Sequence, residues 1–135
     1  MTRSIIREHI FKILFRAEFY NKEELIQQTD YYVSELSSAK DKEIEYIKEK
    51  TLAIIDKLSE IDEIINENSD GWPTNRLGKA ELTIMRLAVY EIRFDEEIPD
   101  GVAINEAVEL SKKYGSDNSS SFVINVLQQV YHKNN

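Results

Sequence analysis

The sequence predicts an all-α protein with about seven helices, and three observations support this prediction. Apolar residues recur at helical spacing along almost the whole chain of 135 residues. The helix-breaking residues are few, four glycines and two prolines, and they fall between these apolar stretches. No stretch alternates polar and apolar residues as a half-buried strand would. The expected helices cover residues 4–20, 23–37, 41–57, 60–67, 78–95, 101–114 and 120–132.

The expected first helix carries two apolar stripes. The stripe that we expect to face the core contains Ile6, Ile10, Ile13, Leu14, Ala17 and Tyr20. The second stripe has i,i+4 spacing throughout: it begins with Arg3 and Arg7 and continues with Phe11, Phe15 and Phe19. Such a row suits single-stranded RNA, because guanidinium groups bind phosphates and aromatic rings stack on bases. Packing within the protein is the alternative, since aromatic stripes at helical spacing usually belong to a core.

Charge is unevenly distributed along the chain. The formal net charge of −8 argues against a general nucleic-acid binder, which usually carries a basic surplus. Residues 1–20 nevertheless hold four cations against two acids, whereas residues 41–70 hold ten acids against four lysines. We therefore expect any RNA to bind at the N-terminal end.

The expected fifth helix, 78–95, is apolar around almost its whole circumference, so it should be the buried centre of the fold. Arg86 lies on its narrow polar strip. Glu91 projects among apolar residues and should be paired or hydrogen-bonded, because an isolated buried charge is very costly. In the preceding loop, Trp72 is expected to pack against the bundle. Arg76 can either neutralise Glu91 or bind an RNA phosphate.

The expected sixth helix, 101–114, is a surface helix with one apolar face. Its apolar arc contains Ala103, Ile104, Ala107, Val108, Leu110, Ser111 and Tyr114. Gly115 follows as a C-terminal cap, and the serines at 119–121 offer N-caps for the last helix.

The sequence contains no recognisable catalytic site. It has no cysteine, which excludes disulfides, thiolate catalysis and cysteine-rich zinc sites. Its two histidines, His9 and His132, lie near opposite ends of the chain, and no common catalytic or phosphate-binding motif occurs. We expect the acidic runs at 62–63 and 95–97 to be solvent-exposed rather than to bind a metal. The sequence thus predicts no enzyme activity, no cofactor and no metal.

Length and composition predict a single domain spanning residues 1–135. The N-terminal segment MTRSIIREHIFKILFR scatters charges among its apolar residues, so it is not expected to be a signal peptide. No window approaches the length of a membrane span. These features, with the absence of cysteine, predict a cytoplasmic protein.

Several spaced segments resemble the NusB family. They are Trp72 with Arg76-Leu77, residues 84–91 (IMRLAVYE), Ile98-Pro99, residues 102–115 (VAINEAVELSKKYG), and Ser119 with Phe122-Val123 and Val126-Leu127. Arg7-Glu8, followed by an apolar helix that ends near Phe15, is similar to the family's N-terminal segment. The resemblance covers nearly the whole chain, strongly from residue 72 onward and weakly between 21 and 70.

This resemblance implies an all-α fold of two small packed helical bundles. NusB proteins bind the boxA element of ribosomal RNA operon transcripts together with NusE, a small-subunit ribosomal protein, and help RNA polymerase read through terminators. By position, the family likeness assigns RNA contacts to Arg3, Arg7 and Phe15, a NusE contact to Glu81, and a place bordering both partners to the loop at 117–119. The candidate RNA-binding residues are therefore Arg3, Arg7, Phe15, Arg76, Asn118 and Ser119, and the candidate partner-binding residues are Glu81 and Asp117.

The sequence departs from the family pattern at two places, and each departure predicts a property of the protein. The family's arginine-rich start is thinned to Arg3 and Arg7, which predicts weak RNA binding by the chain alone. The usual FVNGVL becomes FVINVL at 122–127, which loses a glycine and should favour the helix by up to about 1 kcal/mol.

Two other functions compete with the adaptor role. An acidic helical scaffold for protein–protein contacts is one, and an RNA-binding module like that attached to some ribosomal RNA cytosine methyltransferases is the other. The NusB family includes dimers, so both a monomer and a homodimer are compatible with the resemblance.

Overall fold

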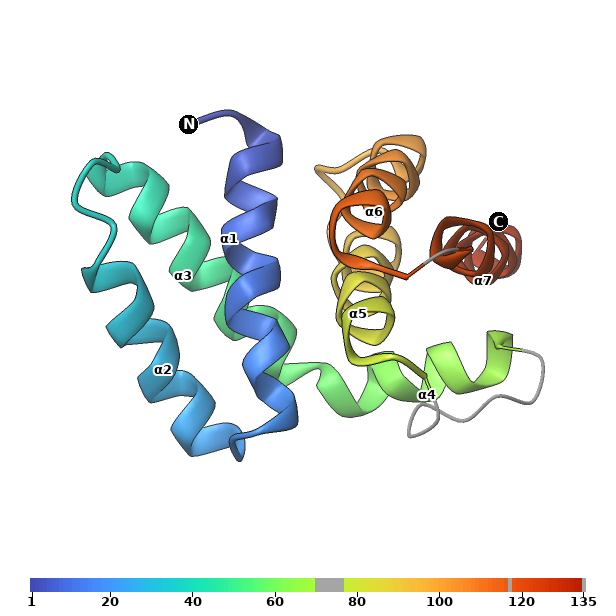
Figure 1. The fold of residues 1–135 in the computed structure, drawn as a ribbon, viewed down its shortest axis with the longest axis horizontal. Coiled ribbons are helices and arrows are strands. Elements are labelled where there is room, and N and C mark those ends of the chain that lie inside the picture. Colours follow the sequence, from blue (N-terminus) through green and yellow to red (C-terminus); the bar gives the residue numbers. More distant parts are fainter. Residues whose placement is uncertain (70–76, 117, 135) are drawn as a thin grey trace. The chain divides into compact units, whose positions relative to one another are not determined.

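A computed structural model describes residues 1–69, 77–116 and 118–134, and within these residues the chain forms helices and no strand (Figure 1). The elements are α1 (Arg3–Phe15), the 3-10 helix η1 (Arg16–Glu18), α2 (Lys22–Ser34), α3 (Asp41–Asp56), α4 (Leu58–Asn68), α5 (Lys79–Phe94), α6 (Asp100–Tyr114) and α7 (Ser119–Asn134). The predicted all-α class is confirmed. The chain divides into two compact units, Met1–Asp56 and Lys57–Asn135. Trp72, Arg76 and Asp117 lie outside the described residues.

The first unit contains α1, α2 and α3, with α3 packed against both other helices (Figure 1). Its core is apolar and includes Ile10, Ile13, Leu14, Leu25, Ile47 and Ile54. At the start of α1 the Thr2 hydroxyl accepts a hydrogen bond from the Ile5 amide at 3.2 Å. At the start of α2, Asn21 and Glu24 form a reciprocal capping box.

The first helix is shorter than predicted. We expected it to continue to Tyr20, but α1 ends at Phe15 and a single 3-10 turn follows. The physical reason lies in the next helix, because Asn21 can cap α2 only with an extended backbone (φ −73°, ψ 176°). The chain must therefore leave the helical conformation before residue 21, although the apolar spacing continues to Tyr20.

The second unit is built around α5, which packs against α4, α6 and α7. Every residue from 82 to 89 is buried, which confirms that this helix is the buried centre predicted from its apolar circumference. The surface position of α6 is also confirmed, because Ala103, Ala107 and Leu110 are buried whereas Glu109 is exposed. Helix α7 runs without interruption through FVINVL and buries Val123, Val126, Leu127 and Val130.

A bidentate ion pair joins α4 to α5. Arg86 Nε donates to Asp62 Oδ1 and Arg86 Nη2 donates to Asp62 Oδ2, both at 2.8 Å. The prediction that Asp62 is simply solvated was therefore wrong: its side chain is 27% exposed and that of Arg86 is 11% exposed. The partners are 24 residues apart, so only the packing of α4 on α5 brings them together.

Glu91 on α5 is buried, as its position among apolar residues predicted.

Among the described residues, no helix is both long and apolar enough to cross a membrane.

Candidate nucleic-acid interface

The row of arginines and phenylalanines that begins on α1 and ends at Phe19, just after η1, is exposed at both ends and buried in its middle. Arg3 is exposed, but Arg7 is only 4% exposed and Phe11 only 3%. Phe15 is half-buried, and Phe19 is 61% exposed. Phe11 therefore belongs to the core, as the packing alternative expected, whereas Phe19 presents its ring to solvent.

The three rings form a continuous aromatic ladder. The centroids of Phe11 and Phe15 are 6.2 Å apart, as are those of Phe15 and Phe19, and each pair is tilted by about 50°. These distances lie within the range of favourable aromatic contact. The buried Phe11 ring therefore supports Phe15, and Phe15 supports the exposed Phe19.

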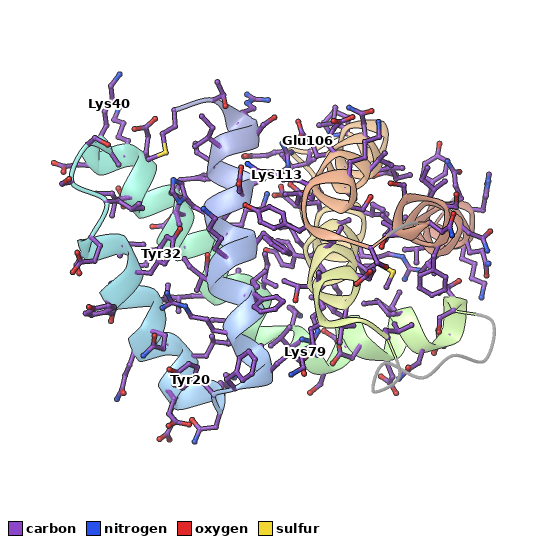
Figure 2. All side chains as sticks on the ribbon, in the orientation of Figure 1. Tyr20, Tyr32, Lys40, Lys79, Glu106 and Lys113 are labelled. Atoms are coloured by element: carbon purple, nitrogen blue, oxygen red, sulfur yellow. The ribbon has the colours of Figure 1, made fainter. Side chains whose placement is uncertain are left out.

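A polar cluster joins α1 and η1 to α2. Arg16 Nη1 donates to Gln28 Oε1 at 2.7 Å, and the guanidinium carbon lies 5.3 Å from the centre of the Tyr32 ring. Figure 2 shows Tyr32 on α2, where its hydroxyl shares a 2.7 Å hydrogen bond with His9 Nδ1 of α1. Sequence analysis missed this cluster, because its members come from α1, η1 and α2, and local spacing does not encode how these elements pair.

Both titratable members of this cluster favour their neutral forms. Burial lowers the pKa of His9, and the nearby positive charge of Lys12 lowers it further. Burial raises the pKa of Tyr32, and this effect is larger than that of the Arg16 charge, which lowers the pKa. The cluster thus fixes α1 to α2 through neutral groups and one cation, Arg16.

A second group of candidate residues gathers in the other unit, where α6 turns into α7. Glu81, near the start of α5, accepts hydrogen bonds through Oε1 from Ser119 Oγ at 2.6 Å, Ser116 Oγ at 3.2 Å and the Ser116 amide at 3.3 Å. Asn118 is exposed, with a left-handed backbone (φ 71°). The structure thus brings Glu81, predicted to lie on a helix, into contact with Ser119 of the predicted loop, and Oε1 of Glu81 accepts its hydrogen bonds from the chain's own serines.

The charge of Glu81 reflects these contacts. Burial by itself raises the pKa of the carboxyl, but the hydrogen bonds donated by Ser119 and Ser116 outweigh burial, so the pKa lies below its ordinary value. Sequence analysis missed Ser116. The available signal was the serine-rich stretch around Gly115, which is typical of a turn rich in capping hydroxyls.

The described residues contain no group of three or more His, Cys, Asp or Glu side chains that could hold a metal ion. Arg3, Arg7 and Phe15 lie in the first unit, and Glu81, Asn118 and Ser119 lie in the second.

Comparison with known proteins gives consistent matches. Residues 4–132 match the NusB family. The chain is 55% identical over 127 residues to the transcription antitermination protein NusB of Agathobacter rectalis, covering 94% of this chain and 97% of the relative. It superposes on Thermotoga maritima NusB with a TM-score of 0.90 at 33% identity, covering 98% of this chain and 92% of that one. A chain in the crystal structure of NusB and NusE in complex with double-stranded RNA matches with a TM-score of 0.84 at 27% identity, covering 98% and 99%.

Proposed function

The chain belongs to the NusB family, and from that premise we propose that it is a transcription antitermination factor that binds RNA and is not an enzyme. In this role it binds boxA-type RNA of ribosomal RNA operon transcripts together with NusE and acts on the elongating RNA polymerase in the cytoplasm. The observation that carries the proposal is the match over nearly the full length of both this chain and an antitermination protein. A relative solved with NusE and RNA supports the choice of partners.

We further propose that residues 1–135 act as one RNA-binding domain, to which the two units contribute different surfaces. The first unit contributes Arg3 and the ladder that leads to Phe19. The second contributes the exposed Asn118 at the α6–α7 turn. Because the arginine-rich start of the family is thinned to Arg3 and Arg7, we expect NusE to supply part of the positive surface that the RNA needs.

RNA titration with and without NusE tests this function. We expect a labelled boxA RNA to bind the chain alone weakly and to bind more tightly once NusE is added, as measured by fluorescence anisotropy. Because the chain alone neutralises few phosphates, the logarithm of its binding constant should fall only shallowly with the logarithm of salt, by about 0.7 per phosphate. An acidic scaffold would bind NusE but leave the RNA free, and that result would overturn the proposal.

The aromatic ladder should contribute to RNA affinity by stacking. Phe15→Ala and Phe19→Ala are each expected to weaken RNA binding in the presence of NusE by about 1–3 kcal/mol, with the salt dependence nearly unchanged. Arg3→Ala should instead make the fall of the logarithm of the binding constant with the logarithm of salt shallower by about 0.7, the value for one lost phosphate contact.

Tyr31→Ala is the matched control, because Tyr31 is a similarly exposed ring (63%) on α2 outside the row. It should leave RNA affinity unchanged. Loss of RNA binding in Tyr31→Ala, or retention in both phenylalanine variants, would place the RNA elsewhere. If Phe15→Ala chiefly unfolds the chain, the Phe15 ring belongs to the core, and Phe19→Ala then carries the test.

A further inference from the structure

The side chain of Arg16 is held by two residues of α2. Its Nη1 donates to Gln28 Oε1 at 2.7 Å, and its guanidinium carbon lies 5.3 Å from the centre of the Tyr32 ring. The first contact is a hydrogen bond from a charged donor, and the second lies within the range of a cation–π interaction. Tyr32 is in turn fixed by the hydrogen bond that its hydroxyl shares with His9 Nδ1. We call Arg16, Gln28, Tyr32 and His9 the arginine clamp.

The clamp restrains the guanidinium without neutralising it. Both partners from α2, Gln28 and Tyr32, are uncharged at neutral pH. Within the part of the chain that the structure describes, no carboxylate pairs with Arg16, although the sequence holds 25 acids against 17 lysines and arginines. A guanidinium has five N–H donors, and the bond to Gln28 uses one of them. Because Arg16 is only half-buried, its charge and further donors remain available to an anion from outside the chain.

Arg16 also lies beside the exposed end of the aromatic ladder. It follows Phe15 directly, and its carbonyl accepts the Phe19 amide at 2.9 Å across η1. Lys12 is exposed and lies four residues earlier, so it projects from the same side of the helix as Arg16. Two cations therefore run alongside the rings of Phe15 and Phe19. Single-stranded RNA fits such a surface, because its phosphates can meet the cations while its bases stack on the rings.

We propose that Arg16 is a contact for an RNA phosphate, and that Gln28 and Tyr32 are positioning residues that hold its guanidinium ready for that phosphate. The inference rests on the proposed function, which makes RNA the ligand. An unrestrained arginine loses rotamer freedom when it binds, and the clamp removes part of that cost beforehand. The planar guanidinium can also bind two phosphate oxygens at once, which a lysine cannot. Helix α2 thereby takes part in RNA binding through Arg16.

Fluorescence anisotropy with labelled boxA RNA, the full chain and NusE tests this contact. Arg16→Ala should weaken RNA binding by about 10-fold, as expected for the loss of a hydrogen bond from a charged group. The fall of the logarithm of the binding constant with the logarithm of salt should become shallower by about 0.7, because one phosphate contact is lost. Arg16→Lys keeps the charge, so it should restore this salt dependence and only part of the affinity.

Gln28→Ala tests the positioning role. It should weaken RNA binding by about 2- to 5-fold and leave the salt dependence nearly unchanged, because Arg16 still reaches the phosphate but must first be ordered. The double variant should bind no more weakly than Arg16→Ala alone, since Gln28 acts only through Arg16. If circular dichroism shows that Arg16→Ala does not fold, Arg16→Gln carries the same salt test, because it removes the charge but can still donate to Gln28.

Lys40→Ala is the matched control for charge. Lys40 is an exposed cation of the same unit, and Figure 2 shows it at the turn between α2 and α3, beyond the end of α2 that is far from η1. The substitution should leave the RNA affinity and its salt dependence unchanged. Losses equal to those of Arg16→Ala would mean that only the net charge of the chain matters, and would contradict a specific contact at Arg16.

Three other results would overturn the inference. The first is an unchanged salt dependence in a folded Arg16→Ala variant, which would leave Arg16 as a purely structural link between η1 and α2. The second is weaker binding of Arg16→Ala to NusE in calorimetry without RNA, which would make Arg16 a protein contact. The third is a double variant that adds the two single losses in full, which would show that Gln28 acts independently of Arg16. A wild-type chain that does not bind the RNA even with NusE would instead overturn the proposed function.

Discussion

Leu87→Ala is expected to lower the free energy of unfolding by about 2–5 kcal/mol, because it removes a large side chain from the most buried helix and leaves a cavity. Leu87 is 2% exposed and lies within the continuous buried run of α5. Urea denaturation followed by circular dichroism measures the change, with the slope of the transition checked for constancy.

Val102→Ala on α6 is the control for this substitution. Val102 is 40% exposed, so the loss of its methyl groups should change the free energy of unfolding by less than about 0.5 kcal/mol. A similarly small effect for Leu87→Ala would show that α5 is not the centre of the second unit's core.

Asp62→Ala is expected to destabilise the chain by about 2–3 kcal/mol. The substitution removes both 2.8 Å hydrogen bonds that the Arg86 guanidinium donates to the carboxylate. Removing one member of a fully buried pair costs roughly 3–5 kcal/mol. We expect less here because the Asp62 side chain is 27% exposed and water can partly replace it. The same denaturation experiment measures the loss.

Two further variants provide comparisons for Asp62→Ala: one removes the charge of Asp62 but keeps an acceptor, and the other breaks an exposed ion pair elsewhere. Asp62→Asn keeps one good acceptor and should cost less than Asp62→Ala. Glu109→Ala breaks the exposed pair that Glu109 forms with Lys112 at 3.5 Å, and it should change stability by no more than about 0.5 kcal/mol. Equal losses in Asp62→Ala and Glu109→Ala would mean that the α4–α5 ion pair contributes no more than a surface pair.

Local sequence determined where most of the helices lie and which helix is the most buried. Helical spacing and capping residues act over a few positions, so the observed α3 (Asp41–Asp56) and α6 (Asp100–Tyr114) differ from the expected ranges by a single residue at one end. The burial of α5 followed in the same way from its apolar circumference. The family resemblance likewise rested on segments read directly from the chain, and the match over residues 4–132 confirmed it.

The exposure of individual residues in the candidate interface was decided by tertiary structure. Phe11 and Phe19 are chemically identical and equally spaced from Phe15, yet one is 3% exposed and the other 61%. Spacing along one helix cannot separate them, because burial depends on which neighbouring elements reach each ring and on where the helix ends.

The same limit applies to contacts between distant residues. Asp62 meets Arg86 across 24 residues, and Glu81 meets Ser119 across 38. In each case the partners lie on different helices, and nothing within a few residues of either one specifies the other. The sequence by itself therefore determined the helices, their apolar faces and the family. Only the packing of the helices decided which polar groups pair across long stretches of sequence. Hydrogen bonds and ion pairs require atoms within about 3 Å, and side chains so far apart in sequence come that close only in the assembled fold.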